Sequence, residues 1–278
     1  MKKKRWMSKK VILSMMLVAV VLVLTGCGTS EITASSTGIW DRYIVYNFAR
    51  AIKGLSFGNA GIGIILFTLV IRVILLPLMH YQTKAMRKTQ DLQPEIKALQ
   101  EEYSSKDPDT QRKLQEETQK LYDKHDVNPY AGCLPLLVQM PILMALWQAI
   151  SRVQGLSQGT FLWLELGVKD PYYILPILAA VLTYVSTKLN SMSQLESNPS
   201  MKMMNIFMPL MILFMGVNLA SGLSLYWVIS NGFQVVQTLM INNPFKIRQE
   251  REEEVKKQKE LEKALRKAQS PKKKRQKK

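Results

Sequence analysis

An apolar run from about Ile62 to Met79 is the feature that most constrains the fold of this chain. The run is long enough to cross a bilayer as a helix, and it contains one charged residue, Arg72. At about 1.5 Å of rise per residue, Arg72 lies roughly 15 Å from the start of the run, too deep for its side chain to reach water easily at that end. A charge at the centre of a bilayer costs about 2.5 to 3.5 kcal/mol on insertion scales. Arg72 is therefore a candidate functional residue.

The rest of the chain repeats this contrast between apolar blocks and basic segments. It carries 38 Lys+Arg against 21 Asp+Glu, a formal net charge of +17, and 47% of its residues are hydrophobic. The charges cluster between and after the apolar blocks, as in a membrane protein with several spans. The predicted spans cover residues 60–81, 131–152, 172–190, 205–221 and 222–242. We therefore expect an all-α polytopic membrane protein with five transmembrane helices, a cytoplasmic helical hairpin and an outer amphipathic helix.

Residues 1–26 have the order of a secretory signal peptide, with a basic start followed by an apolar stretch. The stretch ends in LTGC, which resembles a bacterial lipobox and predicts a lipoprotein whose Cys27 carries the lipid, with palmitate among the expected acyl groups. An uncleaved signal anchor is the alternative. With Cys27 modified, only Cys133 remains, so the chain has no disulfide framework and no cysteine metal site.

The charge of the connecting segments predicts the orientation. Residues 84–129 carry nine Lys/Arg and the tail after Asn243 carries fifteen, whereas residues 153–170 carry one. The positive-inside rule places the first two in the cytoplasm of a bacterial cell and the lipid-anchored N-terminus outside the plasma membrane. The domain plan is a signal peptide (1–26), an extracytoplasmic linker with an interfacial helix (27–59), the first span (60–83), the hairpin (84–129), spans two to five (130–243) and a basic tail (244–278).

Two segments outside the spans have their own patterns. Residues 28–38 are rich in Ser, Thr and Gly and predict a flexible linker. The segment IWDRYIVYNFARAIKGLSF (39–57) predicts a helix along the outer membrane surface, because apolar and basic residues share it. Its expected apolar face consists of Ile39, Tyr43, Phe48 and either Ile44 or Tyr46.

The segment 84–129 predicts two helices joined by the turn SSKDPD. Apolar residues recur at helical spacing on both sides of that turn, at Leu92, Ile96, Leu99 and Tyr103 and again at Leu114 and Leu121. The pattern fits a solvated antiparallel coiled coil and fits equally a hairpin that touches a partner or the membrane surface.

Arg72 has no acidic partner within the predicted spans, since all 21 carboxylates lie outside them. Either a water-filled cavity solvates Arg72 or its partner arrives on another molecule. Polar residues could line such a cavity: Thr68 lies one turn before Arg72, and Gln139 and Gln148 lie on opposite faces of the second span. In the fifth span a single face carries Ser224, Trp227, Asn231, Gln234 and Thr238. Such residues also hold helices together without any cavity.

Catalytic motifs are missing from the sequence. There is no HExxH, no Ser/His arrangement in the spans and no phosphate-binding glycine loop. We therefore expect no enzyme activity, no cofactor and no metal.

Three stretches and the lipobox resemble the YidC/Oxa/Alb family of membrane protein insertases, in its Gram-positive form without a large extracytoplasmic domain. They are NPYAGCLPLLVQMPILMALWQAI, IRVILLPL and LSLYWVISNGFQVVQ, and the likeness extends over essentially the whole mature chain. The resemblance implies a hydrophilic groove that is open to the cytoplasm and to lipid, in which Arg72 attracts the acidic N-terminal tail of a nascent membrane protein. Gln139 and Trp227 match further groove positions, whereas Thr68, Asn231 and Gln234 are added from helical spacing alone.

The implied function is insertion of small membrane proteins into the bilayer and help with their folding, alone or with the Sec translocon. A chaperone that acts only with Sec is the first alternative, and an anion transporter is the second. The basic tail ends in SPKKKRQKK, which fits ribosomal RNA phosphates, as in the family, or anionic lipid headgroups. A merely solvated basic anchor is also compatible with this composition.

Overall fold

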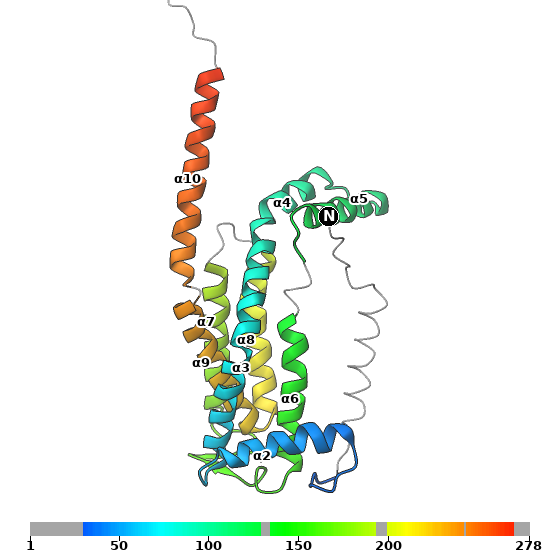
Figure 1. The fold of residues 1–278 in the computed structure, drawn as a ribbon, viewed down its shortest axis with the longest axis vertical. Helices are drawn as coiled ribbons and strands as arrows, with labels where there is room; N and C mark the ends of the chain where they lie inside the picture. The colour runs from blue at the N-terminus through cyan, green and yellow to red at the C-terminus, as the bar shows by residue number, and fades with distance from the viewer. Residues whose placement is uncertain (1–29, 129–133, 193–198, 242, 270–278) are drawn as a thin grey trace, which may run out of the picture.

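Five helices run side by side along the length of the molecule in a computed structural model that describes residues 30–128, 134–192, 199–241 and 243–269 (Figure 1). They are α3 (Ala60–Asp91), α6 (Leu134–Arg152), α7 (Ile174–Met192), α8 (Pro199–Asn218) and α9 (Ser221–Ile241). A helix therefore occupies each of the five ranges expected from the sequence. The predicted signal peptide and Cys27 lie outside the described residues.

Two of these segments are long and apolar enough to cross a membrane, by length and composition. They are α7 and the continuous stretch Ala60–Glu102, which consists of α3 and the helix after it; Met203–Asn218 in α8 is a shorter apolar helix. In the most apolar 18 residues of each segment, only 28% are buried in α7 and 22% in Ala60–Glu102. A core helix of a soluble protein would be mostly buried, so these helices present their apolar side chains to the outside of the molecule.

Helix α3 is longer than the predicted first span. The apolar run ends near Met79, but the helix continues for three more turns to Asp91 and passes through Pro77 without a break. The sequence after the run, KAMRKTQD, consists mostly of good helix formers, so the helix extends past the apolar run. A boundary at residue 83 therefore divides the chain by polarity, and the backbone shows no break there.

A short π-helix, η1 (Trp40–Val45), and helix α2 (Tyr46–Gly54) lie across one end of the bundle, called the α2 end below (Figure 1). The predicted helix is present. Ile39 and Tyr43 of its expected apolar face are 75% and 63% exposed, and the residues that pack into the bundle are instead Trp40 and Val45. The π-helical turn explains the difference, because its i to i+5 repeat places Trp40 above Val45 and shifts the phase of the whole segment.

A β-hairpin at the same end was not expected from the sequence. Strands β1 (Thr160–Phe161) and β2 (Leu164–Glu165) pair antiparallel, with Thr160 opposite Glu165. Strands of two residues leave almost no alternation to detect. The all-α class therefore needs this small correction, in the loop between α6 and α7.

The predicted helical hairpin is confirmed at the opposite end. Helices α4 (Gln93–Glu102) and α5 (Pro108–Lys124) pack through a small cluster of Leu92, Ile96 and Val127. Asp107 caps α5 by accepting a hydrogen bond from the Thr110 N–H at 2.9 Å. Hydrogen bonds from Ser105 and Thr110 hold the pKa of the Asp107 carboxyl well below its usual range.

The C-terminal helix α10 (Pro244–Gln269) leaves the bundle at the hairpin end (Figure 1). Arg251 of α10 forms an ion pair with Asp91 at the end of α3, at 2.5 Å. This contact ties the start of the charged tail to the helix that carries Arg72.

The hydrophobic core lies mainly at the α2 end. There α2, α3, α6, α9 and the α6–α7 loop bury their apolar side chains together. Glycines permit close approach: a Cβ atom at Gly63 of α3 would overlap the carbonyl oxygen of Ile52 in α2, and one at Gly61 would overlap the ring of Phe161. At Gly63, helices α2 and α3 therefore meet backbone to backbone, and at Gly61 the ring of Phe161 lies directly on α3.

The tight contact at Gly63 predicts a specific sensitivity. Gly63→Ala should destabilise the protein by about 1 to 3 kcal/mol, because the backbone of α2 must move away from the new methyl group. Thermal unfolding in detergent measures this change.

Gly232→Ala in α9 is the matched control, since its Cβ would make only an ordinary contact with Leu182 at 3.9 Å. The helix preference of alanine should leave that variant as stable as the wild type or slightly more stable. Equal losses of stability in both variants would contradict the assigned contact.

Candidate functional site

Arg72 lies in the middle of α3 and faces α9. Its side chain is half-buried, its Nε donates to Ser230 Oγ at 3.4 Å, and its Nη1 approaches Met79 Sδ at 3.7 Å. Both contacts are long and involve uncharged acceptors. Arg72 forms no ion pair with any carboxylate in the described part of the chain. The expectation from the sequence, an arginine without an internal counter-charge, therefore holds for these residues.

Two contacts use only two of the five N–H donors of the guanidinium. A guanidinium offers donors in a planar fork that matches a carboxylate or phosphate. Arg72 can therefore accept a bidentate anion without first breaking an ion pair within the described residues.

The other predicted site residues lie mostly along α9 or against it. Gln139 of α6 is half-buried and donates from Nε2 to the hydroxyl of Tyr226 at 2.5 Å. Trp227 is 8% exposed, and Asn231 donates to its carbonyl oxygen at 3.0 Å. Gln234 donates to Thr238 Oγ1 at 3.5 Å. The structure thus brings Arg72 and Gln139 to the same helix, while Asn231 and Gln234 bond along that helix.

Thr68 differs from its predicted place. Its side chain is fully buried, and its hydroxyl donates to the Ile64 carbonyl oxygen at 2.6 Å, one turn earlier in α3. A threonine satisfied in this way offers no exposed hydroxyl to a ligand. Helical spacing alone aligned it with Arg72, but packing at the α2 end covers it.

Tyr226 and Ser230 were missed in the sequence. Both side chains are 2% exposed; Tyr226 bonds to Gln139 and Ser230 bonds to Arg72, as described above. Ser230 lies three residues after Trp227, so it belongs to the polar face of α9 as much as Asn231 does. The polar pattern could therefore have included Ser230, whereas the role of Tyr226 depends on where α6 packs.

Burial changes sharply along the bundle near Arg72. The buried residues of α3 are five between Gly61 and Thr68, followed by Gln82, and every residue between Leu69 and Tyr81 is half-buried or exposed. On α6 the buried residues begin at Ala145, whereas residues 137–144 are half-buried or exposed. Arg72 therefore lies one turn beyond the packed α2 end, where the helices cover one another less completely.

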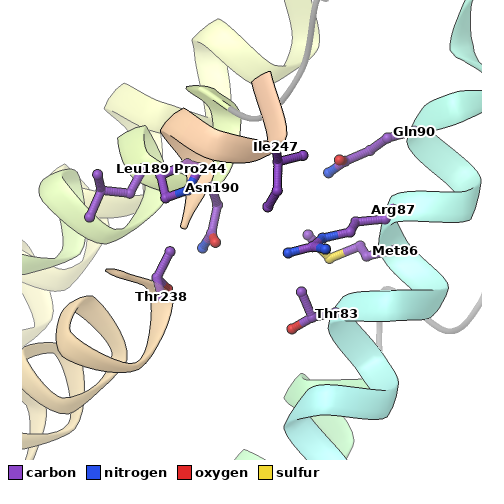
Figure 2. A pocket seen from close by; sticks show the side chains of 9 residues that line it. All are labelled: Thr83, Met86, Arg87, Gln90, Leu189, Asn190, Thr238, Pro244 and Ile247. Atoms are coloured by element: carbon purple, nitrogen blue, oxygen red, sulfur yellow. The ribbon is translucent and has the colours of Figure 1, made fainter. Parts of the chain in front are cut away.

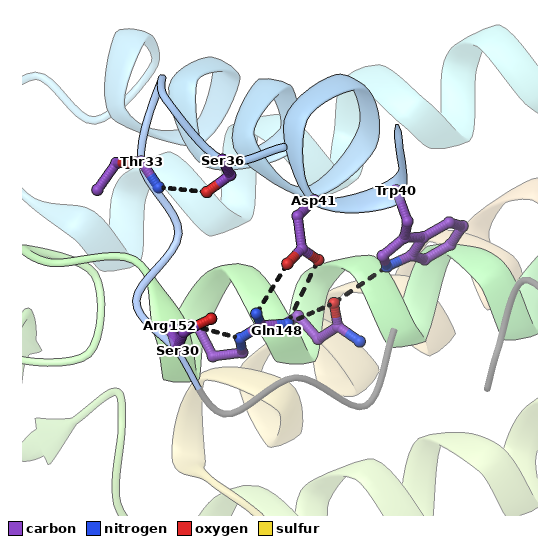
Figure 3. Close-up of polar contacts among 7 residues, drawn as sticks. All are labelled: Ser30, Thr33, Ser36, Trp40, Asp41, Gln148 and Arg152. Atoms are coloured by element: carbon purple, nitrogen blue, oxygen red, sulfur yellow. Dashed lines mark hydrogen bonds and ion pairs between the residues drawn. The ribbon is translucent and has the colours of Figure 1, made fainter. Parts of the chain in front are cut away.

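A polar network closes the α2 end (Figure 3). Arg152, the last residue of α6, pairs with Asp41 of η1 at 2.8 Å, and the Arg152 side chain is only 7% exposed. Gln148 accepts from Trp40 Nε1 at 3.0 Å and from Arg152 at 3.3 Å. Gln148 contacts η1 in this network whereas Gln139 contacts α9, as predicted for residues on opposite faces of α6.

The same network holds part of the predicted flexible linker. Arg152 Nε donates to the Ser30 carbonyl oxygen at 2.9 Å, and the Ile32 N–H donates to the Arg152 carbonyl oxygen at 2.9 Å. Ile32 is 2% exposed. The prediction of a flexible linker therefore does not fit residues 30–32, which a buried isoleucine and an arginine 122 positions from Ser30 hold in place.

A small pocket lies at the hairpin end, apart from Arg72 (Figure 2). Side chains of α3, α7, α9 and α10 surround it: Thr83, Met86, Arg87, Gln90, Leu189, Asn190, Thr238, Pro244 and Ile247. Its nearest residue on α3, Thr83, is three turns from Arg72. The pocket shows that the four helices diverge slightly at this end, but it contains none of the predicted site residues.

These features define a helical membrane protein with a packed α2 end and, next to it, a half-buried arginine that pairs with no carboxylate among the described residues. Residues 52–250 match the family model described as the 60Kd inner membrane protein. The chain therefore belongs to the 60Kd inner membrane protein family.

Relatives at high identity agree with this assignment. The chain is 67% identical to the membrane protein insertase YidC of Enterococcus faecalis over 96% of its own length and 97% of that protein. It is 55% identical to the membrane protein insertase YidC 1 of Lactococcus lactis, over 94% of this chain and 99% of that one. A crystal structure of an active YidC insertase with its first transmembrane domain resolved matches with a TM-score of 0.58 and 30% identity. That match covers 84% of this chain and 52% of the solved one, so this chain spans about half of that protein.

The Asp41–Arg152 pair predicts a stability difference. Asp41→Asn leaves the nearly buried guanidinium of Arg152 without its counter-charge, which should cost about 1 to 3 kcal/mol. Thermal unfolding in detergent at low and high salt measures the loss.

Glu116→Gln is the matched control, because the Arg112–Glu116 pair is exposed on both sides. Loss of such a surface pair should change the stability by less than about 1 kcal/mol. An effect of Asp41→Asn no larger than that of Glu116→Gln would show that the network contributes little.

Proposed function

We propose that the protein inserts small membrane proteins into the bilayer and assists their folding, and that Arg72 receives the acidic N-terminal tail of each client. The observation that carries this proposal is the half-buried Arg72, which has no carboxylate partner in the described chain and lies one turn beyond the packed α2 end. The names of the relatives support the insertase activity. No enzymatic step, cofactor or metal takes part.

The proposed arrangement in the membrane follows the sequence. Helices α3, α6, α7, α8 and α9 are the five spans, the α2 end faces outside, and the α4–α5 hairpin and α10 lie in the cytoplasm. A signal peptide ends before Cys27, which carries the lipid anchor. The protein resides in the bacterial plasma membrane.

The proposed groove is open on the cytoplasmic side of the packed end, where residues 69–81 of α3 and 137–144 of α6 are incompletely covered. Arg72, Gln139, Asn231 and Gln234 face it, with Trp227 at its closed end; Thr68 lies beneath it. Water in such a groove solvates the tail of a client, so the tail need not cross bare hydrocarbon.

Charge attraction then holds the tail for a limited time. Two unit charges 4 Å apart attract by about 4 kcal/mol at an effective dielectric constant of 20, against about 1 kcal/mol in water. That attraction is comparable to the cost of about 2.5 to 3.5 kcal/mol for Arg72 itself at mid-bilayer. The apolar helix of the client then partitions into lipid at roughly 25 cal/mol per Å² of apolar surface, and the tail follows it across.

Insertion into liposomes without Sec components tests the role of Arg72. The client is a single-span protein with a short acidic tail, and its protection from protease reports insertion. Wild type and Arg72→Lys should insert it, and Arg72→Ala should not, because only the first two keep the charge.

Matched controls separate attraction from folding. A client whose tail carboxylates are replaced by amides should lose most of its dependence on Arg72. Ser230→Ala, which removes a contact to Arg72, should slow insertion more than Ser224→Ala, whose serine bonds to Gly216 of α8 instead. Equal insertion by all variants would overturn the role of Arg72, and failure of the wild type would favour a chaperone that acts only with Sec.

The basic tail is proposed to bind the ribosome. Its last nine residues, SPKKKRQKK, follow α10, whose start is fixed by the Arg251–Asp91 pair. Removal of residues 270–278 should abolish co-sedimentation with ribosomes in detergent, while wild-type binding should weaken steeply with salt. A variant with glutamine in place of Lys272, Lys273 and Lys274 should lose part of the binding. Unchanged co-sedimentation of the truncated protein would leave anionic lipid as the partner.

A further inference from the structure

Three loops at the α2 end each place a large apolar residue in the left-handed backbone region. They are Phe57 (φ 46°), Leu162 (φ 55°) and Tyr173 (φ 56°). Residues with a side chain rarely adopt this conformation, and turns that need it normally contain glycine or asparagine. The three side chains are 83%, 74% and 47% exposed. Packing within the described chain therefore does not explain why large apolar residues occupy these positions.

The three loops belong to one region. Phe161, next to Leu162 in the β-hairpin, packs over Gly61 at the start of α3, four residues after Phe57. The hairpin is joined to the third loop by Asp170, which is 1% exposed and accepts from Trp163 Nε1 at 3.2 Å and from the Tyr172 N–H at 3.1 Å. A buried carboxylate thus fixes the relative positions of the hairpin and the loop that precedes α7.

The position of these loops identifies what they contact. Tyr173 directly precedes α7, and α7 exposes apolar residues from its first turn, among them Ile174, Ile177 and Leu178. Nineteen helical residues span about 28 Å, close to the roughly 30 Å of a hydrocarbon core. If α7 crosses the bilayer, Tyr172 and Tyr173 lie at the boundary between headgroups and acyl chains. Phe57 lies five residues before the apolar run of α3, at a similar depth.

The chemistry of the side chains agrees with that position. Tyrosine and tryptophan are enriched at membrane interfaces, where one part of the ring meets lipid and the polar atom remains hydrated. Trp163 is 40% exposed while its N–H is already bonded to Asp170, so its ring can enter lipid without losing a hydrogen bond. Protein docking would favour a continuous face, whereas these are separate loop tips at the ends of spans.

We infer that Phe57, Leu162, Trp163, Tyr172 and Tyr173 form a lipid-binding rim that enters the interfacial layer of the bilayer around the α2 end. The rim fixes the depth of that end, and therefore the depth of Arg72 one turn inside it. The inference rests on the proposed membrane crossing of α3 and α7 and is independent of insertion activity.

Tryptophan quenching in vesicles tests the rim. Leu162→Trp and Phe57→Trp are reconstituted in phosphatidylcholine brominated either near the headgroups or near the chain ends, and the added emission is compared with that of Gln158→Trp. Gln158 is the matched control because it is an exposed polar residue of the same loop. The added emission of the two rim variants should lie at shorter wavelength and be quenched about twofold or more beyond the control, most by bromine near the headgroups.

Quenching no stronger than in Gln158→Trp would overturn the rim. If the added tryptophans prevent folding, the native Trp163 gives the same information: Trp163→Phe should lower the fraction of emission quenched by shallow bromine. An unchanged fraction would also overturn the inference. Because no client is present, a negative result here leaves the insertion experiment interpretable by itself.

Discussion

An arginine inside an apolar helix must be solvated by something, and the arrangement of this protein follows from that requirement. Arg72 meets only a serine hydroxyl at 3.4 Å and a methionine sulfur at 3.7 Å among the described residues. Neither neutralises a charge, so water or a client must do so. The packed α2 end lies immediately on one side of Arg72, which leaves the opposite side as the route by which either can enter. In the proposed function, the glycine contacts and the Asp41–Arg152 network matter because they close the end of the bundle that faces outside.

The helices could be predicted from the sequence because their signals are local. Apolar runs, basic connections and a turn such as Asp107–Thr110 predict a helix at each of α3 and α5 to α9, although α3 extends past its predicted end and α8 begins six residues early. The sequence is less informative where contacts between residues far apart in the chain determine the local structure. No local pattern shows that Arg152 holds residues 30–32, and a π-helical turn changes which side of the helix Trp40 occupies. The β-hairpin depends on packing against Gly61 rather than on its own four strand residues.

The candidate site was predictable to the extent that it depends on charge. Arg72 could be identified because a charged residue is costly anywhere in an apolar run. The polar neighbours were harder, since a threonine or serine in a helix can bond to its own backbone, as Thr68 does, or to another helix, as Ser230 does. Sequence spacing gives the face of a helix but not the depth of packing on that face. Thr68 and Arg72 share a face and differ in burial because the core ends between them.

In the proposed function, the charges that predict the orientation also act on a client. The tail after Asn243 lies on the side from which the proposed groove opens, and it carries fifteen basic against six acidic residues, whereas residues 84–129 carry nine against ten. The field of this C-terminal segment attracts the acidic tail of a client over a Debye length of about 8 Å at physiological salt and repels a basic one. In the same proposal Arg72 lies beyond that range, in surroundings of lower dielectric constant, and acts after the tail has entered. In the proposed mechanism, surface charge thus selects which tails approach, and Arg72 determines how long they stay.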